Sequence, residues 1–159
     1  MSTKKRDVIV FGISSSLSAL LFFLAYLFTL KYRGTSHGIS GNGNLGLMFI
    51  FPAIPIYIVA LIYTYRTSRQ LPLGPGMTKL SLIGLTLLIV ACTYGEYAMI
   101  NRLLHHLGGG TNDPNSVIYR YSFLNQYTNK LFFNAYTFMT GLSFASVIAF
   151  VLRKGQKIR

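Results

Sequence analysis

Four long apolar runs constrain the fold of this chain more than any other feature. A helix needs roughly 20 apolar residues, each rising about 1.5 Å, to cross the hydrocarbon core of a bilayer. The stretch from Leu17 to Leu30 carries no charge on any face, and Glu96 is the only acidic residue inside any run. The runs, each about long enough to span, are Val8–Leu30, Leu45–Tyr63, Leu80–Ile100 and Leu131–Leu152.

This pattern predicts an all-α, polytopic bundle of four transmembrane helices, with residues 1–159 forming one membrane domain. A soluble helical bundle would show apolar stripes beside polar faces, and a membrane β-barrel would show short alternating strands. Backbone groups in lipid must be satisfied within the spanning segment, so each run is expected to be helical. The first run is longer than the apolar region of a signal peptide, and we interpret it as a retained span.

The distribution of Lys and Arg predicts that both termini lie on the cytoplasmic side, an N-in/C-in orientation. Four spans place the termini and the loop Thr64–Lys79 on one side, which carries twice as many basic residues as the other. The inner set is Lys4, Lys5, Arg6, Arg66, Arg69, Lys79, Arg153, Lys154, Lys157 and Arg159, and the outer set is Lys31, Arg33, Arg102, Arg120 and Lys130.

The formal net charge of +12 indicates membrane lipid rather than nucleic acid as the partner. The basic residues are dispersed in twos and threes at the ends of the spans, where lipid headgroups lie, and no long basic arm is present. We expect contact with anionic headgroups on the inner face, in the plasma membrane of a prokaryote.

The longest loop, residues 101–130, is the most favourable place for a recognition surface. The third helix is expected to extend beyond the membrane before the loop breaks at Gly108. The later segment Val117–Tyr127 mixes apolar and aromatic residues, and we interpret it as an interfacial helix rather than a short strand. The candidate outer recognition surface consists of Arg102, His105, His106, Asp113 and Arg120.

Glu96 is the residue whose position within a span carries the largest free-energy cost, because its side chain is ionisable. One interpretation is structural: Glu96 pairs with a cation at the outer ends of neighbouring helices, with Asn134 adding a hydrogen bond. The other interpretation is functional: Glu96 is a proton or cation site in a small transporter, which would have to oligomerise to enclose a pathway. The candidate intramembrane polar site comprises Glu96, Lys31, Arg33, Lys130 and Asn134.

No catalytic, cofactor or metal motif is recognisable. The chain has only three carboxylates, and two of them, Asp7 and Asp113, are predicted on opposite sides of the membrane, which argues against paired-carboxylate chemistry. The single cysteine, Cys92, argues against disulfide exchange and structural zinc. His105 and His106 are neighbours on a predicted helix and point about 100° apart, so they are poorly placed to chelate one ion. We therefore expect no cofactor, no metal and no enzyme activity.

These observations favour a small accessory or binding protein, one that packs against a larger membrane complex or acts as an outward-facing immunity or resistance factor. The alternative is the oligomeric, proton- or cation-coupled transporter that uses Glu96. Small residues such as Gly141, Ala145 and Ala149 follow one another at helical spacing. They are predicted to form close helix contacts within the bundle, with a larger membrane partner or in a homo-oligomer.

Overall fold

The computed structural model describes residues 2–33 and 43–153. It confirms the all-α fold, with four helices that are long and apolar enough to cross a membrane. No strand occurs within the described residues. The helical elements are α1 (Thr3–Leu27), α2 (Leu47–Gln70), α3 (Pro75–His106), α4 (Val117–Tyr121), the short 3-10 helix η2 (Asn129–Leu131) and α5 (Ala135–Arg153).

The helices start where their sequences supply suitable first residues. Ser2 caps α1, its hydroxyl accepting a hydrogen bond from the backbone N–H of Lys5 at 3.4 Å. Pro75 occupies the first turn of α3, where its missing N–H is not needed. As predicted, α3 continues past its apolar run, ending at His106.

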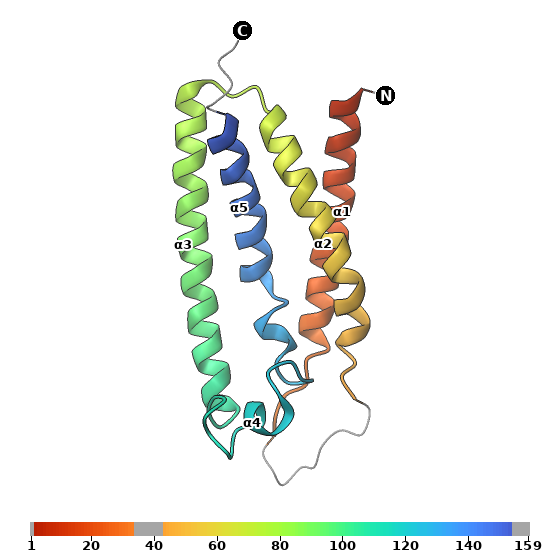
Figure 1. The fold of residues 1–159 in the computed structure, drawn as a ribbon, viewed down its shortest axis with the longest axis vertical. Helices are drawn as coiled ribbons and strands as arrows, with labels where there is room; N and C mark the ends of the chain where they lie inside the picture. Colours follow the sequence, from red (N-terminus) through yellow and green to blue (C-terminus); the bar gives the residue numbers. More distant parts are fainter. Residues whose placement is uncertain (1, 34–42, 154–159) are drawn as a thin grey trace.

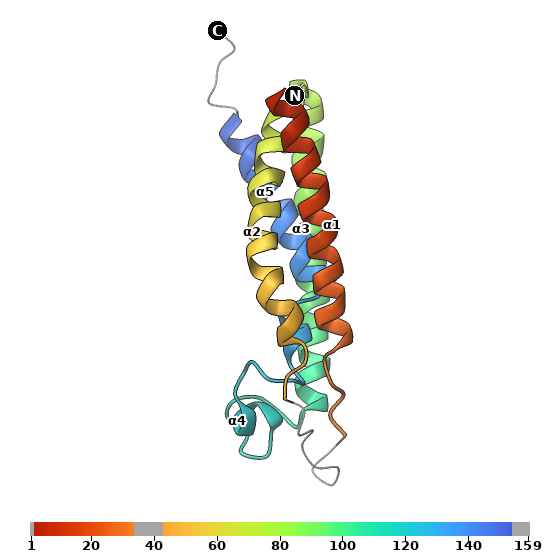
Figure 2. The same ribbon diagram turned by 90° about the vertical axis from the view of Figure 1, so that its right-hand side faces the viewer.

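The chain forms an elongated bundle whose two ends differ (Figure 1). We call the end that holds the start of α1 and the end of α5 the terminal end. We call the other end the lobe end, because the connection between α3 and α5 folds into a small lobe there (Figures 1 and 2). The N-in/C-in orientation, which would make the lobe end the outer one, stays a prediction.

The order of the long helices in space, α1, α2, α5 and α3, differs from their order along the chain. In the described part of the chain, α1 packs on α2, α2 on α5 and α5 on α3; α1 also contacts α5, whereas the backbones of α1 and α3 are not adjacent. In Figure 1, α5 accordingly lies between α3 and the pair formed by α1 and α2. The outer flanks of α1 and α3 are therefore open toward the surroundings.

The interior contains small side chains, and many large apolar side chains face outward. Ala25, Ala53 and Ala60 have no exposed surface, whereas Phe51 and Leu87 are 70% and 65% exposed. A membrane bundle has this distribution because lipid solvates large apolar groups, and close backbone approach at small residues supplies the packing.

A separate apolar core holds the lobe together. Leu103 and Leu107 at the end of α3 pack against Val117 and Ile118 of α4. The N–H of Val117 donates to the carbonyl of Leu107 at 3.0 Å, which fixes α4 against the end of α3. The lobe is thus an ordered part of the molecule rather than a loose connection.

The helix predicted over Val117–Tyr127 is shorter than expected, because α4 ends at Tyr121. Ser122 follows with φ 66° and ψ 172°, a backbone conformation outside the helical region. Asn125 stabilises this departure: its side-chain amide donates to the Ser122 carbonyl at 2.7 Å and its oxygen accepts from the N–H of Tyr127 at 2.8 Å. Local bonds of this kind compete with helical ones.

Candidate functional site

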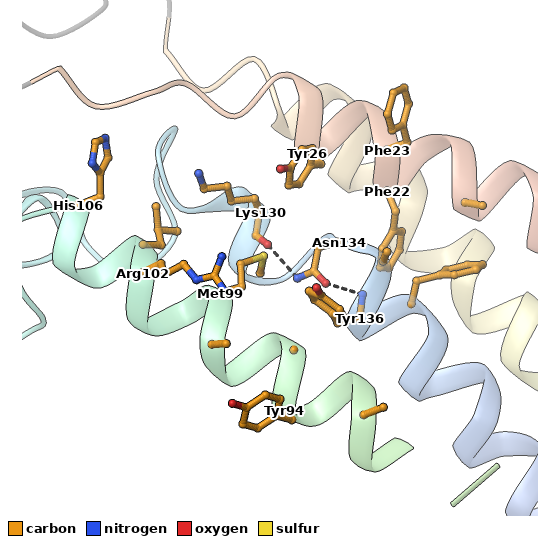
Figure 3. A pocket seen from close by; sticks show the side chains of 17 residues that line it. Phe22, Phe23, Tyr26, Tyr94, Met99, Arg102, His106, Lys130, Asn134 and Tyr136 are labelled. Atoms are coloured by element: carbon orange, nitrogen blue, oxygen red, sulfur yellow. Dashed lines mark hydrogen bonds between the residues drawn. The ribbon is translucent and has the colours of Figure 1, made fainter. Parts of the chain in front are cut away.

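A cleft of about 1080 Å³ opens between α1, α3 and the start of α5, near the lobe end (Figure 3). Its volume slightly exceeds the usual range for ligand sites, about 300 to 1,000 Å³. The cleft lies where the backbones of α1 and α3 are not adjacent, and α5 and η2 contact both of these helices behind it. Its lining is Ala19, Phe22, Phe23, Tyr26, Ala91, Tyr94, Gly95, Ala98, Met99, Arg102, Leu103, His106, Lys130, Asn134, Ala135, Tyr136 and Phe138.

Two close contacts position the walls of the cleft. A side chain at Gly95 would collide with the ring of Tyr136, its Cβ lying 2.8 Å from Cζ, so glycine lets α3 approach α5 here. On the other side, Phe22 of α1 packs edge-on against Phe138 of α5, with ring centroids 5.5 Å apart. Both contacts belong to helices that carry lining residues, so the shape of the cleft follows from helix packing.

The cleft is chemically divided along its length. Toward the middle of the bundle its lining is apolar and includes Phe22, Phe23 and Ala91. Toward the lobe end it carries three basic side chains, Arg102 and His106 from α3 and Lys130 from η2, which we call the basic rim. Figure 3 shows the basic rim at one end of the cleft and the two phenylalanines toward the other.

The basic rim has no acidic partner among the residues that the structure describes. Within the described residues, the Arg102 and Lys130 side chains take part in no ion pair, and every ion pair found there involves Asp7. Lys31 lies close enough to Lys130 for the two charges to repel each other. The lobe end of the cleft is therefore a concentration of positive charge.

Asn134 connects the predicted polar site to the cleft. Its side-chain oxygen accepts from the N–H groups of Tyr136 at 2.7 Å and Thr137 at 3.1 Å, the pattern of a helix N-cap on α5. Its amide group donates to the carbonyl oxygen of Lys130 at 2.9 Å. Figure 3 draws the two hydrogen bonds that join Asn134 to Lys130 and to Tyr136.

The structure brings part of the predicted intramembrane site together. Asn134 lies close enough to the Glu96 carboxyl to interact with it, and Lys130 is tied to Asn134 through its carbonyl. Glu96 makes no ion pair within the described residues, and its buried Oε2 has no hydrogen-bond partner there. Lys31 lies near Lys130, whereas Arg33 is exposed and is not a lining residue of the cleft.

The predicted outer recognition surface divides into two places. Arg102 and His106 line the cleft, and His105 is exposed outside it. Asp113 and Arg120 bond within their own loop, Asp113 accepting from the Gly110 N–H at 2.9 Å and Arg120 donating to the Asn115 side chain at 3.2 Å. No cluster of three or more His, Cys, Asp or Glu side chains suited to a metal occurs in the described part of the chain.

A second polar site, at the terminal end, was not predicted as a site from the sequence. Asp7 has no exposed surface, and its Oδ2 accepts from Arg66 Nε at 3.1 Å and from Gln70 Nε2 at 2.7 Å. Arg66 and Gln70 are four residues apart on α2, a spacing that places both on one helix face. That spacing, opposite a lone acid at the start of the first apolar run, is the signal by which this contact could have been found.

Comparison of the chain with protein-family models, with curated proteins and with solved structures finds no match.

Proposed function

We propose that this protein is a small multi-pass membrane binding protein that holds one lipid or lipid-like amphiphile in the cleft at its lobe end. The observation that carries the proposal is the division of the cleft into an apolar length and a basic rim. An amphiphile has the same division, because its chains avoid water and its headgroup requires it. The membrane supplies such molecules at high concentration beside the opening.

The length of the cleft supports this ligand class. Along α3 the lining extends from Ala91 to Arg102 before it reaches His106. At about 1.5 Å per residue, Ala91 and Arg102 are about 16 Å apart along the helix axis. Half of a hydrocarbon core is about 15 Å thick, so the apolar part of the cleft matches the depth of one leaflet.

The lateral opening between α1 and α3 supports entry from the bilayer. The backbones of these two helices are not adjacent in the described part of the chain, so no closely packed helix pair has to separate for a chain to enter. Exposed aromatic side chains, Phe23 and Tyr94, lie on the two sides of this opening. A ligand that arrives from the lipid phase therefore keeps its chains in an apolar environment throughout.

The finer roles predicted from the sequence are compatible with this proposal and stay predictions. A subunit of a larger complex, or an outward-facing immunity or resistance factor, would use the bound amphiphile as its ligand or as part of its binding surface. A transporter would need Glu96 to exchange a proton or cation, and its buried Oε2, which has no hydrogen-bond partner in the described part of the chain, is the observation that favours this second candidate. Location in a prokaryotic plasma membrane also stays a prediction.

Tryptophan fluorescence tests the proposal because the natural chain contains no tryptophan. Phe23→Trp places a reporter in the cleft, and Phe51→Trp places one on α2 outside the cleft lining. Both phenylalanines are exposed, at 60% and 70%, and both lie four residues from the lobe-end terminus of their helix. The pair is therefore matched in depth and surroundings.

The two variants are purified in mild nonionic detergent and titrated with phospholipid whose chains carry bromine, which quenches tryptophan. We expect quenching of Phe23→Trp to saturate at about one lipid per protein, because the cleft is a discrete site. Quenching of Phe51→Trp should rise gradually with the lipid fraction in the micelle. Gradual, identical curves for both variants would contradict the proposal.

A further inference from the structure

We infer that the cleft selects a lipid with an anionic, phosphate-bearing headgroup, held by Arg102 and Lys130 at the basic rim. This inference rests on the proposed function and names the class of its ligand. The chain has three carboxylate side chains, and in its described part none of them forms an ion pair with the basic rim.

The three carboxylates are occupied or placed elsewhere. Asp7 is bound by Arg66 and Gln70 at the terminal end. Asp113 accepts a hydrogen bond from the Gly110 N–H within its own loop. Glu96, which lies toward Asn134, is not a lining residue of the cleft. We therefore expect an anionic group from outside the protein to neutralise the basic rim.

The chemistry of the two rim residues fits a phosphate group. Arg presents a planar set of N–H donors that bonds two phosphate oxygens at once, and Lys adds a mobile point charge. In the described part of the chain the Arg102 guanidinium and the Lys130 ammonium donate no hydrogen bond to protein, although both line the cleft. A bound anion would also relieve the repulsion between Lys130 and Lys31.

The depth of the basic rim fixes which part of a lipid it meets. Arg102 comes just after Ile100, where the apolar run of α3 ends. Beyond that point the bilayer changes from hydrocarbon to headgroups. A lipid with its chains beside Phe22 and Phe23 therefore places its phosphate at the level of Arg102. The lipid comes from the leaflet at the lobe end, which is the outer leaflet if the predicted orientation holds.

The Phe23→Trp reporter also tests the inference, in titrations with brominated phosphatidylglycerol and brominated phosphatidylcholine. We expect half-saturation with the anionic lipid at a concentration about tenfold lower or more, since charge-assisted contacts to phosphate and the net lipid charge both favour it. Arg102→Ala with Lys130→Ala should raise that concentration toward the value for the zwitterionic lipid. The exchange variant, Arg102→Lys with Lys130→Arg, should still prefer the anionic lipid. That result would show that the double alanine variant loses the preference because it loses the two charges.

Arg120→Ala is the matched control, because Arg120 is a basic lobe residue bonded within its own loop and is not a lining residue. It should leave both titrations unchanged. Saturable quenching with equal half-saturation for the two lipids would overturn the headgroup inference while leaving the proposed function intact. Absence of saturable quenching with either lipid would overturn both. Displacement of the anionic lipid by an equal concentration of inorganic phosphate would show that a free anion, and not a lipid, occupies the rim.

Discussion

At the scale of single residues, the buried carboxylate at the terminal end is that of Asp7. It is fully buried, and two donors from α2 hold its Oδ2. A carboxylate taken out of water is tolerated only when it is paired and hydrogen-bonded, so this contact fixes α1 against α2. Arg66 remains 39% exposed in its side chain, which reduces the strength of the pair through solvent screening.

We predict that Asp7→Asn lowers the free energy of unfolding by about 1 to 3 kcal/mol, because the charge-assisted bonds to Arg66 and Gln70 become ordinary ones. The measurement is thermal or denaturant unfolding of the purified protein in detergent. Asp113→Asn is the control, since Asp113 is exposed, and its effect should stay within about 0.5 kcal/mol. Equal losses in the two variants would show that the buried contact is not special.

The sequence allowed only part of this residue-scale description to be predicted. Glu96 stands out because an acid inside an apolar run is conspicuous, and Asn134 was predicted beside it. Asp7 lies just before an apolar run, where a polar residue is ordinary, and its burial depends on how α1 packs against α2. That packing is a property of the folded bundle, so the residues around Asp7 alone do not reveal it, and the signal lies in the four-residue spacing of Arg66 and Gln70 on α2.

At the scale of secondary-structure elements, the crossing of α2 and α5 depends on one glycine. A Cβ at Gly141 would overlap the hydroxyl of Tyr57 and lie 3.3 Å from Cδ2 of Leu61. The Tyr57 hydroxyl is held in place because it donates to the carbonyl of Phe138 at 2.7 Å. Small residues at helix crossings allow this close approach. Gly141 was predicted to form a close helix contact, and in the structure that contact joins α5 to α2 of the same chain.

We predict that Gly141→Ala destabilises the protein by about 1 to 3 kcal/mol, because the added methyl group must displace Tyr57 or separate α2 from α5. Gly12→Ala is the matched control: Gly12 also lies within a helix, and a Cβ there would meet nothing within 4 Å. That control should be neutral or gain up to about 1 kcal/mol from helix propensity. Unfolding in detergent compares the two, and a Gly141→Ala protein as stable as the control would contradict the account of this crossing.

The extent of the long helices could be predicted from apolar length, and that of α4 could not. Apolar runs determine where a spanning helix is stable, and all four helices were found, although α2 and α3 extend past their apolar runs to Gln70 and His106. After Tyr121 the chain continues with residues of reasonable helix propensity, but Asn125 and Thr128 bond to neighbouring backbone groups instead. These competing bonds are specific to the folded lobe, so the predicted helix over Val117–Tyr127 was too long.

At the scale of the whole molecule, the bundle combines two differently constructed ends. The terminal end is held by a half-buried ion pair between α1 and α2, and the lobe end by an apolar core around Leu107 and Ile118. Two reciprocal amide bonds between Asn44 and Asn129, at 2.9 and 2.6 Å, join the start of α2 to η2. The cleft lies beside this supported lobe, so its basic rim is carried on ordered backbone.

The cleft itself was beyond prediction from the sequence. Arg102, His106 and Lys130 were each singled out, but they were assigned to two different candidate sites. Their convergence depends on α5 packing between α3 and the α1–α2 pair, which leaves α1 and α3 apart. The order of the helices in space is determined by many weak contacts together. Because the four apolar runs have similar compositions, the sequence does not indicate which helices are neighbours.

The most direct test of the central claim is native mass spectrometry of the protein extracted from its membrane in mild detergent. We predict a main species with one retained phospholipid of anionic class, because the cleft offers one apolar length and one basic rim. Arg102→Ala with Lys130→Ala should lose this adduct, and Arg120→Ala should keep it. A lipid-free wild-type protein, or adducts that reflect the bulk lipid composition in all three proteins, would contradict the account.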